Sequence, residues 1–246
     1  MRWDRGGTRP FVFGGSSTPA VKALLVANVV VFLFQMLSQS LAQVRIERLF
    51  GLVPYEVVHH LFLWQLATYM FLHGGLLHIA FNMLALWMFG AELEGLWGTH
   101  KFLRFYFITG IGAGIMTTLV TPNSYTVTIG ASGAIYGLLA AYGLLFPDRI
   151  ILLYFVLPIR AKYLVLILGL ITFWSSLSAT GGGVAHVAHL GGMLFGWLYL
   201  RGPRWPKVGN PIGNAYQRWK QKRLRKKFQV YYSKTRGEEE EEERRR

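Results

Sequence analysis

Six strongly apolar stretches alternate with more polar segments along this chain of 246 residues. A membrane-spanning helix needs about 20 mostly apolar residues. The pattern predicts an all-α, polytopic membrane protein with six spanning helices, over residues 21–37, 76–89, 102–120, 130–146, 163–177 and 184–200. The second helix is short unless residues 70–77 or 90–93 extend it.

Two further segments are apolar without fitting a span. Residues 150–157 are too short to cross a membrane and end at Pro158, so we place them at the membrane surface. The first loop, residues 38–75, is long and not very polar. It is either an amphipathic cap on the outer side or a set of short helices half-sunk in the outer leaflet.

Positive charge along the chain predicts its topology. Six spans place both chain ends on one side, and cytoplasmic segments hold most of the Lys and Arg residues of a membrane protein. The segments on the side of the N-terminus are rich in these residues, whereas the other side carries only Arg45 and Arg48. We therefore expect both termini to be cytoplasmic.

The composition changes this picture little. The chain is 52% hydrophobic and 15% charged, whereas a typical soluble domain is about 25% charged. Acidic residues between positions 10 and 200 are too few for a surface in contact with water, and so exclude a water-soluble protein. The lack of cysteine excludes disulfides and thiolate metal sites.

The ends of the chain differ from its apolar middle. We predict a cytoplasmic N-terminal segment over residues 1–20, a six-helix membrane domain over residues 21–200 and a basic cytoplasmic tail over residues 201–246. Basic segments just inside a membrane bind anionic lipid headgroups. We expect the Lys/Arg cluster at 218–227 to bind such lipids and not nucleic acid.

One serine and one histidine are candidates for chemistry. Ser132 begins the fourth apolar stretch, and His189 lies within the sixth. Polar groups at membrane depth are costly, so a functional site is the first hypothesis for them. A serine activated by a histidine base is sufficient for acyl transfer. Both residues enter from the outer side in the predicted topology, so they can meet at a similar depth.

Small residues repeat at four-residue spacing on both of these stretches. Such faces let membrane helices approach closely. The repeats are Gly133, Gly137 and Ala141 on the fourth stretch, and Ala188, Gly192 and Gly196 on the sixth. Helix packing alone would explain the glycines, but packing does not require a serine and a histidine at the same contact. The pattern therefore favours a catalytic interpretation.

Position predicts the other groups of the site. No Asp or Glu lies in a span near this depth, so the site is a dyad without an orienting carboxylate, and the ring of Tyr136 is placed to hold the imidazole. His78 and Asn82 are four residues apart and face the same way. With the N–H of Ser132 at a helix start, they can stabilise an oxyanion. Alone, they would indicate an ordinary interhelical hydrogen bond.

Three motifs resemble those of the rhomboid intramembrane serine proteases, over roughly residues 22–201: His78-Ile79-Ala80-Phe81-Asn82, Gly130-Ala131-Ser132-Gly133 and Ala188-His189-Leu190-Gly191-Gly192. The resemblance implies a six-helix rhomboid fold of the bacterial type, in the inner (plasma) membrane, that cleaves transmembrane segments of single-pass proteins. It implies Ser132 as nucleophile, His189 as base, and His78 and Asn82 as oxyanion donors. Supporting roles fall to Gly130, Gly133 and Tyr136. No cofactor or metal is expected.

A second histidine competes for the role of base. His186 lies one helical turn before His189. The Gly191-Gly192 pair that follows His189 favours His189.

Three other functions fit parts of the sequence. Paired histidines in a membrane can conduct ammonium or protons, but transporters usually show an internal repeat, and none is visible. Zinc could bind the histidines at positions 73, 78, 186 and 189, but there is no HExxH motif and no carboxylate near them. An adaptor that only binds membrane helices would not need Ser132.

Overall fold

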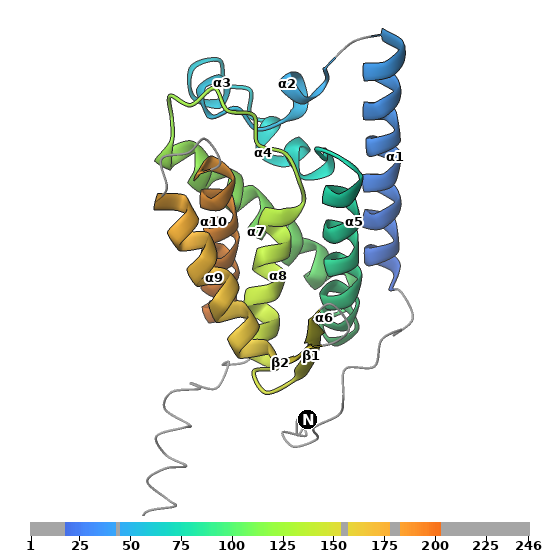
Figure 1. Ribbon diagram of the computed structural model, residues 1–246, viewed down its shortest axis with the longest axis vertical. Coiled ribbons are helices and arrows are strands. Elements are labelled where there is room, and N and C mark those ends of the chain that lie inside the picture. The colour runs from blue at the N-terminus through green and yellow to red at the C-terminus, as the bar shows by residue number, and fades with distance from the viewer. Residues whose placement is uncertain (1–17, 43–44, 154–156, 178–182, 203–246) are drawn as a thin grey trace, which may run out of the picture. The chain divides into compact units, whose positions relative to one another are not determined.

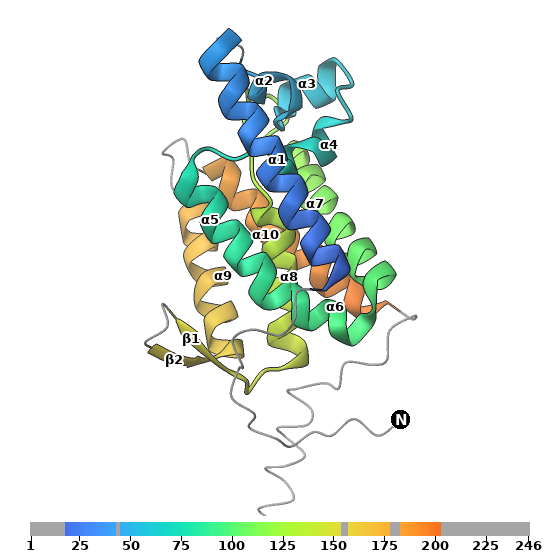
Figure 2. The same cartoon turned by 90° about the vertical axis from the view of Figure 1, so that its right-hand side faces the viewer.

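The computed structural model describes residues 18–42, 45–153, 157–177 and 183–202. Within these ranges the chain forms a helical bundle with a short hairpin at one end and small helices at the other (Figures 1 and 2). The predicted basic tail, from residue 203 on, lies outside the described residues, as does most of the N-terminal segment.

The long helices form where the apolar stretches predict them. Their bounds are Pro19–Ala42 for α1, Thr99–Val120 for α7, Ser132–Leu145 for α8, Ala161–Leu177 for α9 and Gly183–Arg201 for α10. The second predicted helix continues past its expected end, because α5 (Leu76–Ala85) is followed by a π-helical segment η2 (Leu86–Gly90) and by α6 (Ala91–Trp97). The sequence predicts a short second helix unless residues 70–77 or 90–93 extend it. Residues 90–93 do extend it.

The helices differ in length and in apolar character, the two properties that a membrane span requires. Among the described residues, three helical stretches are long and apolar enough to do so: Pro19–Leu41, Leu76–Trp97 and Thr99–Val120. The shorter α8 is apolar too, and nine of its 14 residues are buried. Figure 1 shows α8 in the middle of the bundle, where it contacts α5, α7, α9 and α10. This helix is covered by protein.

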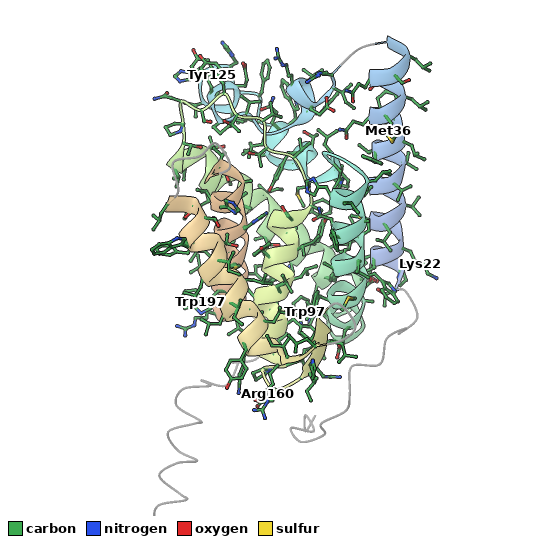
Figure 3. All side chains as sticks on the ribbon, in the orientation of Figure 1. Lys22, Met36, Trp97, Tyr125, Arg160 and Trp197 are labelled. Atoms are coloured by element: carbon green, nitrogen blue, oxygen red, sulfur yellow. The ribbon has the colours of Figure 1, made fainter. Side chains whose placement is uncertain are left out.

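The start of α8 is recessed because the preceding chain is not helical. Residues 121–131, which include Tyr125, run from the C-terminal end of α7 down to the start of α8 (Figures 1 and 3). Thr128 pairs with Leu52 through two backbone hydrogen bonds of 2.8 and 2.9 Å, and the N–H of Gly130 donates to the carbonyl of Tyr69 at 2.9 Å. These bonds satisfy backbone groups of the non-helical segment, and fix Ser132 below the end of the bundle that carries the small helices.

Glycine contacts hold α10 against α8. A Cβ on Gly192 would lie 1.9 Å from the carbonyl oxygen of Gly133, and one on Gly196 would lie 3.0 Å from that of Gly137. The two predicted small-residue faces therefore do meet, at backbone contact. Gly133 itself also faces α7, because a Cβ on it would lie 2.7 Å from Cβ of Ala113.

The first loop folds as short helices. They are α2 (Glu47–Phe50), α3 (Pro54–His59), α4 (Gln65–Thr68) and the 3₁₀ helix η1 (Tyr69–Phe71). The buried amide of Gln65 ties them together, because it accepts the N–H of Val53 at 2.9 Å and donates to the carbonyl of Leu49 at 3.3 Å. Short helices, which belonged to one of the two alternatives for this loop, are present, and their depth in the outer leaflet stays a prediction.

A buried carboxylate joins the beginnings of α1 and α7. Glu94, 2% exposed, accepts hydrogen bonds from the N–H groups of Ala20 and Val21, each at 2.9 Å, and from the hydroxyls of Thr18 and Thr99. Free N–H groups and a positive dipole end make a helix N-terminus a favourable place for an anion. Glu94 thereby fastens α1 to the bundle.

The segment predicted at the membrane surface forms a two-stranded antiparallel hairpin, and the expectation of an all-α fold misses it. Strand β1 (Ile150–Leu153) pairs with β2 (Leu157–Arg160), with Ile150 opposite Arg160. Figure 3 labels Arg160 at the end of the bundle opposite Tyr125. The hairpin forms because Pro147 and Pro158 interrupt helix here, and antiparallel pairing satisfies the backbone.

The glycine contact gives a stability prediction. We expect Gly192→Ala to lower the free energy of unfolding by about 1–3 kcal/mol, the range for an overpacked core, because its Cβ would meet backbone. Gly95→Ala is the matched control, since a Cβ there has nothing within 4 Å. Thermal unfolding in detergent micelles measures both. Equal midpoints for the two variants would contradict a tight α8–α10 contact.

Candidate active site

Ser132 and His189 meet between α8 and α10. The Nε2 atom of His189 lies 2.8 Å from Oγ of Ser132, within hydrogen-bonding distance. Ser132 is the first residue of α8, and His189 lies about two turns into α10. The nearby Gly133–Gly192 contact brings the two backbones together at this depth. This geometry lets the imidazole take the hydroxyl proton.

Tyr136 holds the imidazole in place. Its ring stacks on that of His189 with centroids 4.2 Å apart and planes only 2° from parallel. Within the described residues, the buried Nδ1 of His189 has no hydrogen-bond partner. The orientation of the ring therefore depends on packing, as the sequence predicted for a site without an orienting carboxylate.

His78 faces the same small space as Ser132. A Cβ on Gly130 would lie 2.8 Å from Nε2 of His78 and 3.7 Å from Oγ of Ser132. The N–H of Gly74 donates to Nδ1 of His78 at 3.2 Å, so the proton of a neutral His78 is on Nε2. Nε2–H is thus a donor beside Gly130, whose φ of +125° suits glycine.

Asn82 lies one turn after His78 on α5. Its side chain is 6% exposed, and its Nδ2 donates to the carbonyl of His78 at 2.9 Å. An amide nitrogen carries two hydrogens, so one N–H remains for another acceptor. The structure thus brings Ser132, His189 and His78 together, and places Asn82 beside His78.

The other histidines are neighbours of this group. The ring centroid of His186 lies 5.9 Å from that of His189, and the buried His73 ring lies 5.1 Å from His78. His189, not His186, contacts Ser132. The described residues contain no group of three or more His, Cys, Asp or Glu side chains placed to hold a metal ion.

Two contacts of the site have no signal in the sequence. The tautomer of His78 is set by a backbone N–H, that of Gly74, and any residue but proline supplies one. The hydroxyl of Thr172 on α9 donates to that of Tyr136 at 3.3 Å. Thr172 and Tyr136 are 36 residues apart, and no spacing pattern connects them.

Comparison with known proteins adds the family. The Rhomboid domain matches residues 60–202 of this chain. The chain belongs to the rhomboid family. As a rhomboid protein with long apolar helices, it is an integral membrane protein. The motifs around His78, Ser132 and His189 all lie within the matched region.

Several curated proteins are similar to this rhomboid chain. Rhomboid protease AarA of Providencia stuartii is 30% identical over 210 residues, which cover 76% of this chain and 74% of that protein. Rhomboid protein 1, mitochondrial, of Saccharomyces cerevisiae is 34% identical over 161 residues, 63% of this chain and 43% of that protein. Rhomboid protease GluP of Bacillus subtilis is 33% identical over 146 residues, 59% of this chain. This chain covers 27% of GluP, and so spans less than two thirds of several relatives.

The histidine geometry gives a second prediction. We expect His189→Ala to abolish reaction of Ser132 with a fluorophosphonate probe, because the hydroxyl loses the group that takes its proton. His186→Ala is the matched control and should keep most of the wild-type labelling rate. Loss of labelling in His186→Ala with retention in His189→Ala would reverse the assignment of the base.

Proposed function

We propose that this rhomboid protein is an intramembrane serine endopeptidase that cleaves transmembrane segments of other membrane proteins. The observation that carries the proposal is the 2.8 Å contact between Oγ of Ser132 and Nε2 of His189 at the recessed start of α8. AarA and GluP, two of its relatives, are named rhomboid proteases.

The chemistry follows from these two side chains. Oγ of Ser132 attacks the carbonyl carbon of the scissile peptide bond while Nε2 of His189 takes the hydroxyl proton. The tetrahedral intermediate collapses, the C–N bond breaks, and His189 returns that proton to the leaving amine. A water then attacks the resulting ester, again with His189 as base, and the serine is regenerated.

Three donors are proposed for the oxyanion of the intermediate. They are Nε2–H of His78, the remaining N–H of the Asn82 amide, and the backbone N–H of Ser132. The last has no acceptor within its own helix because it lies in the first turn. Preorganised donors of this kind stabilise charge as it develops. Gly130 keeps the space between His78 and Ser132 open, and Gly133 lets α7 approach.

For the membrane setting we propose six spans with both termini in the cytoplasm of a bacterial cell, in its inner (plasma) membrane. Helices at all six predicted ranges and the distribution of Lys and Arg support this layout. The short α8 fits it because protein surrounds the helix, and buried backbone at membrane depth need not be helical throughout.

The proposed partners follow from the site and the charge. Single-pass transmembrane proteins are the substrates. Anionic lipids bind the cluster at 218–227, which lies outside the described residues, and nucleic acid is not a partner. The proposed chemistry uses only protein groups and water, so it requires no cofactor or metal.

Loss of the nucleophile tests the function. We expect Ser132→Ala to abolish cleavage of a panel of single-pass substrates by the purified protein, with unchanged folding, because only one oxygen atom is lost. EDTA should leave the wild-type rate unchanged. Substantial turnover by Ser132→Ala would refute the serine mechanism, and activity lost in EDTA but restored by zinc would favour a metal site.

The oxyanion donors give a separate prediction. We expect Asn82→Ala to lower turnover by up to about 10²–10³-fold, the range for one such donor, and His78→Ala to act in the same direction. Asn28→Ala is a matched control, because its buried amide also donates to the carbonyl four residues earlier, that of Leu24, at 2.7 Å. Equal rates for Asn82→Ala and Asn28→Ala would show that only the helix contact matters.

A further inference from the structure

The hydroxyl of Thr172 reaches across from α9 to the residue that holds the catalytic ring. Its Oγ1 donates to the hydroxyl oxygen of Tyr136 at 3.3 Å. Thr172 is 2% exposed, and the other buried residues of the 17-residue α9 are Ala161 and Leu164 at its opposite end. The buried residue in the outer half of α9 therefore makes a polar contact with α8.

This use of a helical threonine hydroxyl differs from that of three threonines on helix α7. Within a helix, such a hydroxyl readily bonds to the carbonyl four residues earlier. Thr109, Thr117 and Thr118 on α7 do so at 2.9–3.0 Å. Thr172 instead donates to another helix, so its bond fixes the position of α9 relative to Tyr136.

The bond bears on His189 because little else orients that ring. The imidazole contacts Ser132 through Nε2 and stacks on Tyr136, while its buried Nδ1 has no partner among the described residues. A tyrosine that tilts or slides takes the stacked ring with it. The dyad geometry thus depends on where Tyr136 is held, and Thr172 holds it at its hydroxyl.

We infer that Thr172 is a positioning residue for the Ser132–His189 dyad, acting through Tyr136. The inference rests on the proposed function and deepens it, because it makes the reactivity of the serine depend on the placement of α9. Thr172 touches none of the reacting atoms. It supplies through a hydroxyl and a ring part of the orientation that a carboxylate supplies in a triad.

The test measures the rate at which Ser132 reacts with a small fluorophosphonate in the full-length protein. We expect Thr172→Val, which is nearly isosteric, to slow labelling about threefold. This factor corresponds to the mean free-energy contribution of one hydrogen bond between membrane helices. Tyr136→Phe, which keeps the ring, should slow it by a similar factor. The double variant should be no slower than the slower single variant, because both changes remove the same bond. Thr172→Ser, which keeps the hydroxyl, should restore most of the rate.

Thr118→Val is the matched control, since it removes a buried hydroxyl that bonds only within its own helix. We expect it to label at the wild-type rate and to unfold at a temperature close to that of Thr172→Val. Labelling of Thr172→Val at the wild-type rate, or a double variant slowed by the product of the single effects, would overturn the inference. Failure of the wild type to be labelled at all would instead refute the proposed function.

Discussion

The contact of two backbones without side chains between them determines the rest of this structure. Where α10 crosses α8, the missing Cβ of Gly192 leaves room for the carbonyl of Gly133. Any larger residue would push the helices apart, and the hydroxyl of Ser132 would leave the reach of His189. Membrane helices gain little from burying apolar surface against one another, so close packing of this kind must hold them. The same contact therefore serves stability and chemistry.

Many polar side chains in the bundle are hydrogen-bonded to nearby backbone groups. Threonine hydroxyls on α7 return to their own helix, Glu94 collects the free donors at two helix starts, and Gln35 pairs its amide with the backbone of His73. Such pairing is needed because an unsatisfied polar group at membrane depth is costly. Eight buried side-chain atoms of the described residues depart from this rule, and four of them are ring nitrogens of His73, His186 and His189, in or near the proposed site.

The sequence predicted what depends on local composition and periodicity. Apolar runs located four of the helices to within three residues at each end, whereas the first two continue beyond their predicted ends. The four-residue spacing of small residues located the α8–α10 contact. The spacing of Tyr136 after Ser132 predicted its stack on His189. The π-helical segment at Leu86–Gly90 and the hairpin were not predicted, because they depend on how the backbone is accommodated by its neighbours. The Gly74–His78 bond is local, but its donor is a backbone N–H that no residue type indicates. Motif order suggested the family, and the domain match established it.

The shortness of α8 has a consequence of its own. At about 1.5 Å of rise per residue, its 14 residues cover only about two thirds of a hydrocarbon core that is roughly 30 Å thick. In the proposed six-span layout, the chain from 121 to 131 makes up the difference. In that layout, the length of α8 determines how far below the membrane surface the serine hydroxyl lies. One residue added to or removed from it would also rotate Ser132 by about 100° around the helix axis, so depth and direction cannot change independently.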